Sequence, residues 1–175
     1  MSGVYEFTLV LVLPDTTANP ANYLDALFEA GCDDATIGVG RPGMIALEFS
    51  RDAVSARQAV RSALQDVQRG IPGAELVEVA PDLVNLTDIA GYLGVTKQKL
   101  QKYASGEARR AKAPFPPPVF SGFPKLWHLC DVLAWVAKYT SLAAARELQQ
   151  VARAACLENL AIQEARMEIN EVLLS

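Results

Sequence analysis

Residues 86–103 constrain the fold of this chain more than any other stretch. Their apolar side chains recur at helical spacing until Gly94 interrupts the period and Thr96 restarts it. These side chains are Leu86, Ile89, Ala90, Leu93, Val95, Leu100 and Tyr103. The pattern predicts two short helices that cross through a glycine-containing turn and bury their inner faces together. Since the second helix carries lysines and no acidic residue between Thr96 and Ser105, this helix-turn-helix is suited to lie in a DNA groove.

Charge is distributed unevenly along the chain. The whole chain is acidic, with 16 basic and 20 acidic residues. Residues 1–82 hold 5 basic and 12 acidic residues, whereas residues 83–140 hold 8 basic and 3 acidic residues. Residues 141–175 hold 3 basic and 5 acidic residues. Positive charge therefore gathers around the predicted helix pair, which favours a phosphate-binding surface over the alternative of a solvated face.

Length and composition indicate a folded chain of one or two small domains. The chain has 175 residues, of which 51% are hydrophobic and 21% are charged, a balance that disordered chains do not show. No apolar run approaches the ~20 residues that span a bilayer, and residues 1–3 lack the positive charge of a secretory signal. The three cysteines, Cys32, Cys130 and Cys156, lack metal-ligand spacing and predict reduced thiols. We therefore expect a cytoplasmic protein.

The chain offers no constellation typical of an enzyme. His128 is the only histidine and lies between Trp127 and Leu129, which predicts a partly buried structural side chain. Residues 38–43 match the letters G-x-G-x-x-G, but a strand-like run follows them and Pro42 removes an amide, so they predict a hairpin turn. We expect no catalytic residue, no cofactor and no metal site.

Residues 1–82 predict an α+β domain with the ferredoxin-like βαββαβ order. Its first strand alternates apolar residues from Tyr5 to Leu13. The first helix begins at Asn19-Pro20, with an inward stripe of Tyr23, Leu24, Leu27 and Phe28. The second helix has an inward stripe of Ala53, Ala56, Val60, Leu64 and Val67. The remaining strands are expected at 36–39, 44–49 and 75–79. We expect this domain to serve assembly or sensing.

Residues 83–140 predict a winged helix-turn-helix domain. Prolines exclude helix between residues 114 and 118. The Ser121-Gly122 turn predicts a short hairpin, the wing, with Lys125 near its tip. A further helix is expected to open at Asp131. The proline-rich run could instead be an exposed ligand for aromatic grooves, although its apolar residues Phe115, Val119 and Phe120 favour packing.

Residues 141–175 contain neither proline nor glycine and predict one long helix or a helical hairpin. An apolar stripe recurs at spacings of three, four or seven, at Leu148, Val151, Ala155, Ile162, Ala165, Ile169 and Val172. The stripe could fold onto the chain's own domains or pair with a second subunit. Its regular period favours self-association, so we expect a homodimer or a higher homo-oligomer.

Residues 84–138 resemble the DNA-binding domain of the MerR and phage-excisionase superfamily. The helix-turn-helix motif of that family matches Ile89-Ala90, Leu93-Gly94-Val95-Thr96, Leu100 and Tyr103. The wing and following helix of its excisionase-like branch match Phe115-Pro116-x-Pro118-Val119, Leu126-Trp127 and Asp131-Val132-x-x-Trp135. The resemblance implies a recognition helix starting at Thr96, a wing beside it and dimeric binding to paired half-sites. The arginine and the Tyr-Glu pair usual in MerR recognition helices are absent here, as are the metal-binding cysteines of a C-terminal effector pocket.

Helical geometry assigns roles within the predicted interface. If Val95, Leu100 and Ala104 face inward, the side chains that face the groove are Lys97, Gln98 and Gln101. Glutamine pairs with adenine and lysine reaches guanine, whereas a solvated helix face is the alternative for both glutamines. Phosphate contacts are expected from Lys99, Lys102, Arg109, Arg110, Lys112 and Lys125. Tyr103 is expected to pack its ring inward and to offer its hydroxyl to a phosphate.

These expectations converge on a sequence-specific transcriptional regulator that binds double-stranded DNA as a dimer. Its N-terminal domain would bind a protein partner or a small-molecule effector. The alternative is an antitoxin or a phage-type architectural DNA-binding protein whose acidic N-terminal domain binds a partner protein. RNA recognition by the N-terminal domain is excluded, because that segment is acidic and lacks the basic aromatic strand motif.

Overall fold

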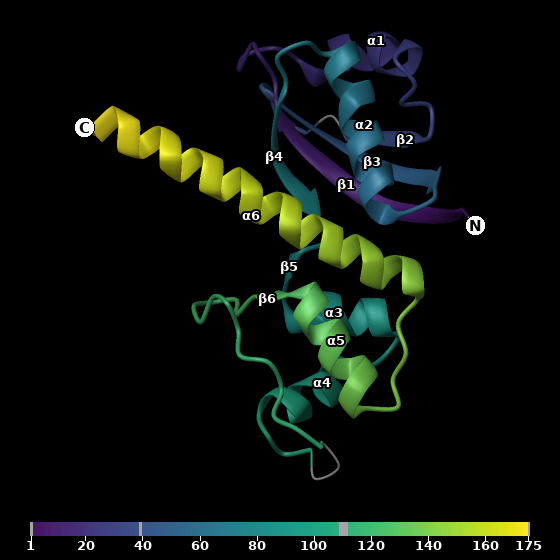
Figure 1. The fold of residues 1–175 in the computed structure, drawn as a ribbon, viewed down its shortest axis with the longest axis vertical. Coiled ribbons are helices and arrows are strands. Elements are labelled where there is room, and N and C mark those ends of the chain that lie inside the picture. The colour runs from purple at the N-terminus through teal and green to yellow at the C-terminus, as the bar shows by residue number, and fades with distance from the viewer. Residues whose placement is uncertain (1, 39, 109–111, 175) are drawn as a thin grey trace.

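The computed structural model describes residues 2–38, 40–108 and 112–174 and has a mixed α+β fold of two units joined by one long helix (Figure 1). The N-terminal unit contains a four-stranded antiparallel sheet with the order β2-β3-β1-β4. Its strands are β1 (Gly3–Val12), β2 (Ala35–Gly38), β3 (Met44–Ala53) and β4 (Glu75–Ala80). Its helical elements are the 3₁₀ turn η1 (Pro20–Tyr23), α1 (Leu24–Glu29) and α2 (Ala56–Gly70).

The alternation predicted for β1 is confirmed and forms the centre of the first core. Tyr5, Phe7, Leu9, Leu11 and Leu13 are each at most 5% exposed. β3 pairs with β1 in the same sheet, and the rings of Phe7 and Phe49, which are partners in register, stack with centroids 5.3 Å apart. The buried side chains of α2 cover this face with Ala56, Ala59, Val60, Ala63 and Val67. β2 and β3, which flank residues 39–43, pair antiparallel, as the predicted hairpin requires, and Val39 lies outside the described residues.

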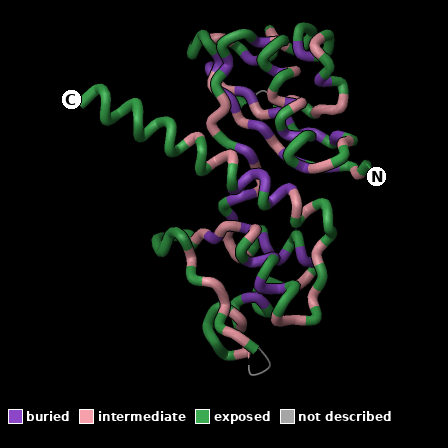
Figure 2. Tube along the Cα trace, viewed as in Figure 1, coloured by how far each residue is buried: buried purple, intermediate pink, exposed green. Residues whose placement is uncertain are grey.

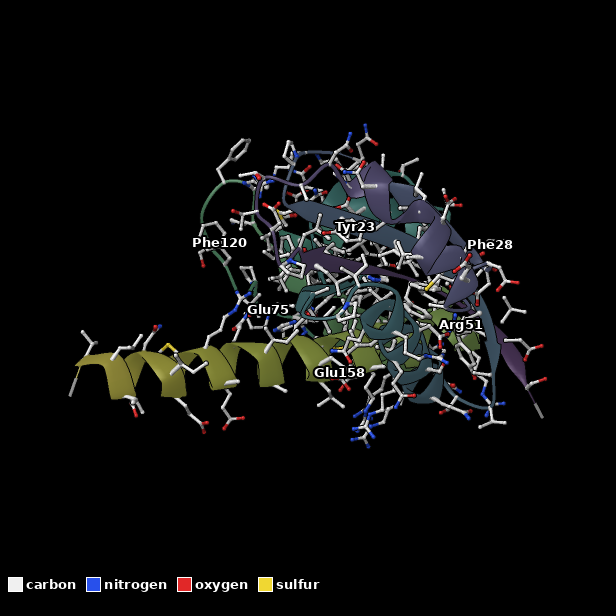
Figure 3. The ribbon with its side chains drawn as sticks, turned by 90° about the horizontal axis from the view of Figure 1, so that it is seen from above. Tyr23, Phe28, Arg51, Glu75, Phe120 and Glu158 are labelled. Carbon is white, nitrogen blue, oxygen red and sulfur yellow. The ribbon has the colours of Figure 1, made fainter. Side chains whose placement is uncertain are left out.

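Two details of the predicted helices are wrong. The first helix is one 3₁₀ turn and six α-helical residues, so only part of the predicted stripe reaches the core: Leu27 is buried and Tyr23 packs partly buried against it. Leu24 and Phe28 are 39% and 67% exposed, and Phe28 points outward in Figure 3. Ala53 ends β3 instead of entering α2, because the Ser55 side chain accepts a hydrogen bond from the Gln58 N–H and starts the helix at Ala56.

The second unit has its own core beneath three helices. The helices are α3 (Leu86–Leu93), α4 (Lys97–Ala104) and α5 (Leu129–Tyr139), and a two-stranded sheet pairs β5 (Leu83–Val84) with β6 (Trp127–His128). The buried residues of this core include Ile89, Leu93, Leu100, Leu129, Val132, Leu133, Trp135 and Val136. α5 begins two residues before the expected Asp131, because the extended backbone of β6 ends at His128 and the helix follows directly.

The proline-rich run packs against the second core at one end and is exposed at the other. No helix forms between residues 114 and 118, as predicted. The Phe115 ring meets that of Trp135 with centroids 5.1 Å apart, and the Trp127 Nε1–H donates to the Pro116 carbonyl over 2.9 Å. Val119 and Phe120 are each 52% exposed, so the packing expected of them is wrong. They lie where the chain leaves the core for a loop that a single bridge between Phe120 and Leu126 closes.

The predicted C-terminal helix is one continuous element, α6 (Arg146–Leu174), whose two halves differ. Val151, Ala154 and Ala155 join the first core, whereas Ala152 belongs to the second core, with Leu148 packed against it. The inner half therefore connects both units, and the outer half extends past them with an exposed surface (Figure 2). Among the described residues, no helix has the length and apolarity that crossing a bilayer requires.

Candidate nucleic-acid interface

The predicted pair of short helices is present, and local hydrogen bonds fix where each helix begins and ends. The Asn85 side chain accepts from the Thr87 and Asp88 N–H groups while Asp88 accepts from the Asn85 N–H, which caps α3. α3 ends at Gly94, whose φ of +61° is a left-handed conformation that favours glycine. The Thr96 hydroxyl then accepts from the Lys99 N–H over 3.3 Å and starts α4. Residues of the turn and of the two helix ends therefore fix where α4 begins.

Two side chains hold α4 against the second core. Leu100 is fully buried, with 0% of its surface exposed. The Tyr103 ring meets the Trp135 ring edge-on with centroids 5.3 Å apart, as the inward packing predicted for Tyr103 requires. The prediction for Ala104 is wrong, because this residue is exposed. It is the last helical residue and lies beyond the contact between Tyr103 and Trp135.

Every side chain of α4 that the sequence predicted to face a groove is exposed in the structure. The exposed residues of the outward face of α4 are Lys97, Gln98, Lys99, Gln101 and Lys102. Within the part of the chain that the structure describes, no salt bridge engages any of the three lysines. Thr96 is also exposed, but its hydroxyl oxygen already accepts the capping hydrogen bond. The face therefore combines uncompensated positive charge with two amide groups able to pair with other molecules.

α4 lies at the end of the second unit that is farthest from the four-stranded sheet (Figure 1). Lys112 is exposed in the chain that follows α4. Arg109 and Arg110, two of the predicted phosphate contacts, lie outside the described residues. Lys125 is exposed as well, but it belongs to the loop of residues 119–126, which projects from the side of the unit next to β6. The lysines of α4 are thus gathered on one helix, whereas Lys125 comes from a separate loop.

The sequence assigned no role to Phe123, which is the most exposed aromatic side chain among the described residues. It is 101% exposed in the same loop as Lys125, and Phe120 is half-exposed at the base of that loop. Figure 3 shows Phe120 standing away from the body of the molecule. The signal in the sequence was two aromatic residues flanking the Ser121-Gly122 turn. An exposed aromatic ring beside a lysine can stack on a base or on a sugar.

Comparisons with known proteins add no further assignment. No family model, curated protein or solved structure matches this chain. The likeness of residues 84–138 to MerR and excisionase proteins therefore depends on the sequence motifs alone.

Proposed function

We propose that the protein is a sequence-specific DNA-binding transcriptional regulator that acts as a dimer through a MerR/excisionase-like winged helix. The observation that carries the proposal is the exposed face of α4, where three lysines and two glutamines project from a helix that Leu100 and Tyr103 fix in place. A rigid helix with charged and amide side chains on its free face is the kind of element that reads a major groove.

We assign each part of the proposed domain to an element of the structure. α3 and α4 would be the helix-turn-helix, and the loop of residues 119–126 would be the wing beside β5 and β6. Gln98, Gln101 and Lys97 would contact base edges, whereas Lys99, Lys102, Lys112 and the wing's Lys125 would contact phosphates. The exposure of all these side chains supports their contact with a duplex.

We assign the N-terminal unit to a ferredoxin-like domain, which the strand order β2-β3-β1-β4 and the antiparallel pairing support. The outer half of α6 is the element we assign to dimerisation. Ile169 and Leu173, which lie four residues apart on one face of this half, are 60% and 77% exposed. A second copy of the same helix would bury these side chains and place two α4 helices on paired half-sites.

Selection of bound sequences from a random duplex library tests the proposal. We expect enrichment of a motif with two related half-sites. Q98A/Q101A should lose discrimination between adenine and other bases and weaken affinity for the selected motif by about 30-fold or more, since each of the two bidentate contacts carries about 1–3 kcal/mol, while affinity for an unrelated duplex stays close to that of the wild type. Gln65 and Gln68 are exposed at the same spacing on α2, so Q65A/Q68A is the matched control and should select the wild-type motif. Failure of the wild type to enrich any sequence would refute sequence-specific binding.

A further inference from the structure

Side chains of three distant segments meet at the junction of the two units. Asp82 lies between β4 and β5, His128 ends β6, and Cys156 lies in the inner half of α6. One ligand atom from each of these residues lies within 4.8 Å of the other two. The cluster is far from the exposed face of α4 and serves no step of the proposed DNA recognition. It brings together an oxygen, a nitrogen and a sulfur donor, the mixed set that zinc-class cations accept.

The carboxylate of Asp82 is the buried centre of the cluster. Asp82 is 2% exposed, and its Oδ1 lies 2.6 Å from His128 Nδ1. Its Oδ2 accepts a hydrogen bond from Asn159 Nδ2 over 2.8 Å. Asn159 is itself held by the backbone N–H and carbonyl of Val79 on the edge strand β4. The carboxylate is therefore oriented by an outer partner that has no freedom to turn, an arrangement typical of metal ligands.

One of two distances between donor atoms of the cluster matches a tetrahedral site. With zinc bonds of about 2.0–2.3 Å, the nitrogen and sulfur ligands of one ion lie about 3.6 Å apart, and its nitrogen and oxygen ligands about 3.3 Å apart. Cys156 Sγ lies 3.5 Å from His128 Nδ1, which matches the first value. The oxygen–nitrogen distance of 2.6 Å is shorter by about 0.7 Å, so the His128–Asp82 hydrogen bond has to open by this amount to admit an ion.

A path from solvent leads to the sulfur of Cys156. A groove of about 490 Å³ between α5 and α6 is lined by both Cys130 and Cys156, together with Asp131 and Arg146. The thiol of Cys130 contacts that of Cys156. Of the three ligands, the groove's lining includes Cys156 alone, so the sulfur is the ligand that it reaches. Entry from solvent is one of the requirements of a metal site that can be checked on coordinates.

We propose that Asp82, His128 and Cys156 bind a zinc-class divalent cation at the junction of the two units. The three ligands come from the connection between the units, the second unit and the helix that joins both cores. A bound ion would therefore couple the packing of α6 to the placement of the DNA-binding unit relative to the sheet. Because binding to the folded state alone stabilises it, the ion would also raise the melting temperature of the chain.

Cobalt binding by the full-length chain tests the proposal, because Co²⁺ coordinated by thiolate absorbs in the near ultraviolet. The protein is treated with chelator, desalted and titrated with Co²⁺, and bound Co²⁺ is then displaced with Zn²⁺. We expect one equivalent per chain, a thiolate charge-transfer band and a Zn²⁺-dependent rise in melting temperature. C156S should lose the band, and H128Q should weaken Co²⁺ affinity by at least tenfold.

C130S is the matched control, because it removes a thiol from the same groove and leaves the three ligands in place. It should retain one equivalent of Co²⁺ and the band. The side chain of His128 is 20% exposed, so we expect H128Q to fold. If C156S fails to fold, H128Q therefore still tests the site. The proposal is overturned if the folded wild type binds no stoichiometric Co²⁺, or if both C156S and H128Q bind as the wild type does.

Discussion

Removal of two charges from α4 should weaken duplex binding by a predictable factor. Lys99 and Lys102 are exposed on adjacent turns of α4 and engage no salt bridge within the described ranges 2–38, 40–108 and 112–174. Their replacement in K99Q/K102Q should therefore leave the free energy of unfolding within about 0.5 kcal/mol of the wild type. Any loss of affinity then reports on contact with phosphate.

The magnitude follows from counterion release. Each phosphate contact contributes a slope of about −0.9 to the dependence of log K on log salt, so two lost contacts make the slope about 1.8 less negative per chain. The contribution of counterion release is about zero at 1 M salt and grows with each decade of dilution. At 0.1 M salt, loss of the two contacts therefore lowers the binding constant by about 1.8 decades, a roughly 60-fold loss of affinity per bound chain. A dimer in which both α4 helices engage the duplex doubles the change in slope.

Fluorescence anisotropy with a labelled duplex, repeated from about 50 to 200 mM salt, measures both quantities. R57Q/R61Q is the control, since it removes two exposed charges from α2, and the ion pair that it breaks, Arg61 with Glu158, is long at 3.9 Å and worth little. The control should bind as the wild type does. Equal slopes for K99Q/K102Q and the wild type would show that these lysines do not contact phosphate.

Three further predictions concern the framework around the interface. L100A removes a side chain that is 0% exposed and should cost about 2–5 kcal/mol in urea unfolding of the second unit; a cost below 1 kcal/mol would contradict the anchoring of α4. Truncation after Gln163 removes the exposed outer half of α6 and should turn a dimer into a monomer in sedimentation without unfolding either core; a persistent dimer would place the interface elsewhere. Burial, followed by the charge of Asp66, raises the pKa of Cys32 from 9.0 to about 11. The folded state therefore disfavours the thiolate, and its stability relative to C32A should be constant below pH 9 and fall by up to about 2–3 kcal/mol between pH 9 and 11; an unchanged difference would show that Cys32 is solvated.

Elements with a strong local pattern were predictable from the sequence. The alternation from Tyr5 to Leu13 identifies the buried face of β1, since a strand repeats every two residues. Gly94 marks the turn between α3 and α4 because it adopts a left-handed conformation. The exposed face of α4 follows from its helical period alone. Each of these features depends on neighbours in sequence and needs no knowledge of the rest of the fold.

Features that depend on distant partners were not predictable. A helical stripe shows that one face of α6 is apolar, but not that Val151 enters one core and Ala152 the other. Val119 and Phe120 have the composition of packed residues, yet they lie beyond the last contact with the second core. His128 meets Asp82 and Cys156 across sequence separations of 46 and 28 residues, which no spacing rule connects.

Lysine reactivity in the presence and absence of DNA tests the central claim most directly. Acetylation rates, measured residue by residue by mass spectrometry, report which lysines a bound duplex shields. We predict that Lys97, Lys99 and Lys102 become severalfold less reactive with duplex DNA, whereas Lys138, an exposed lysine on α5 over the ring of Tyr139, keeps its rate. Unchanged rates at all three lysines of α4 under saturating DNA would contradict the assignment of this face as the DNA-binding surface.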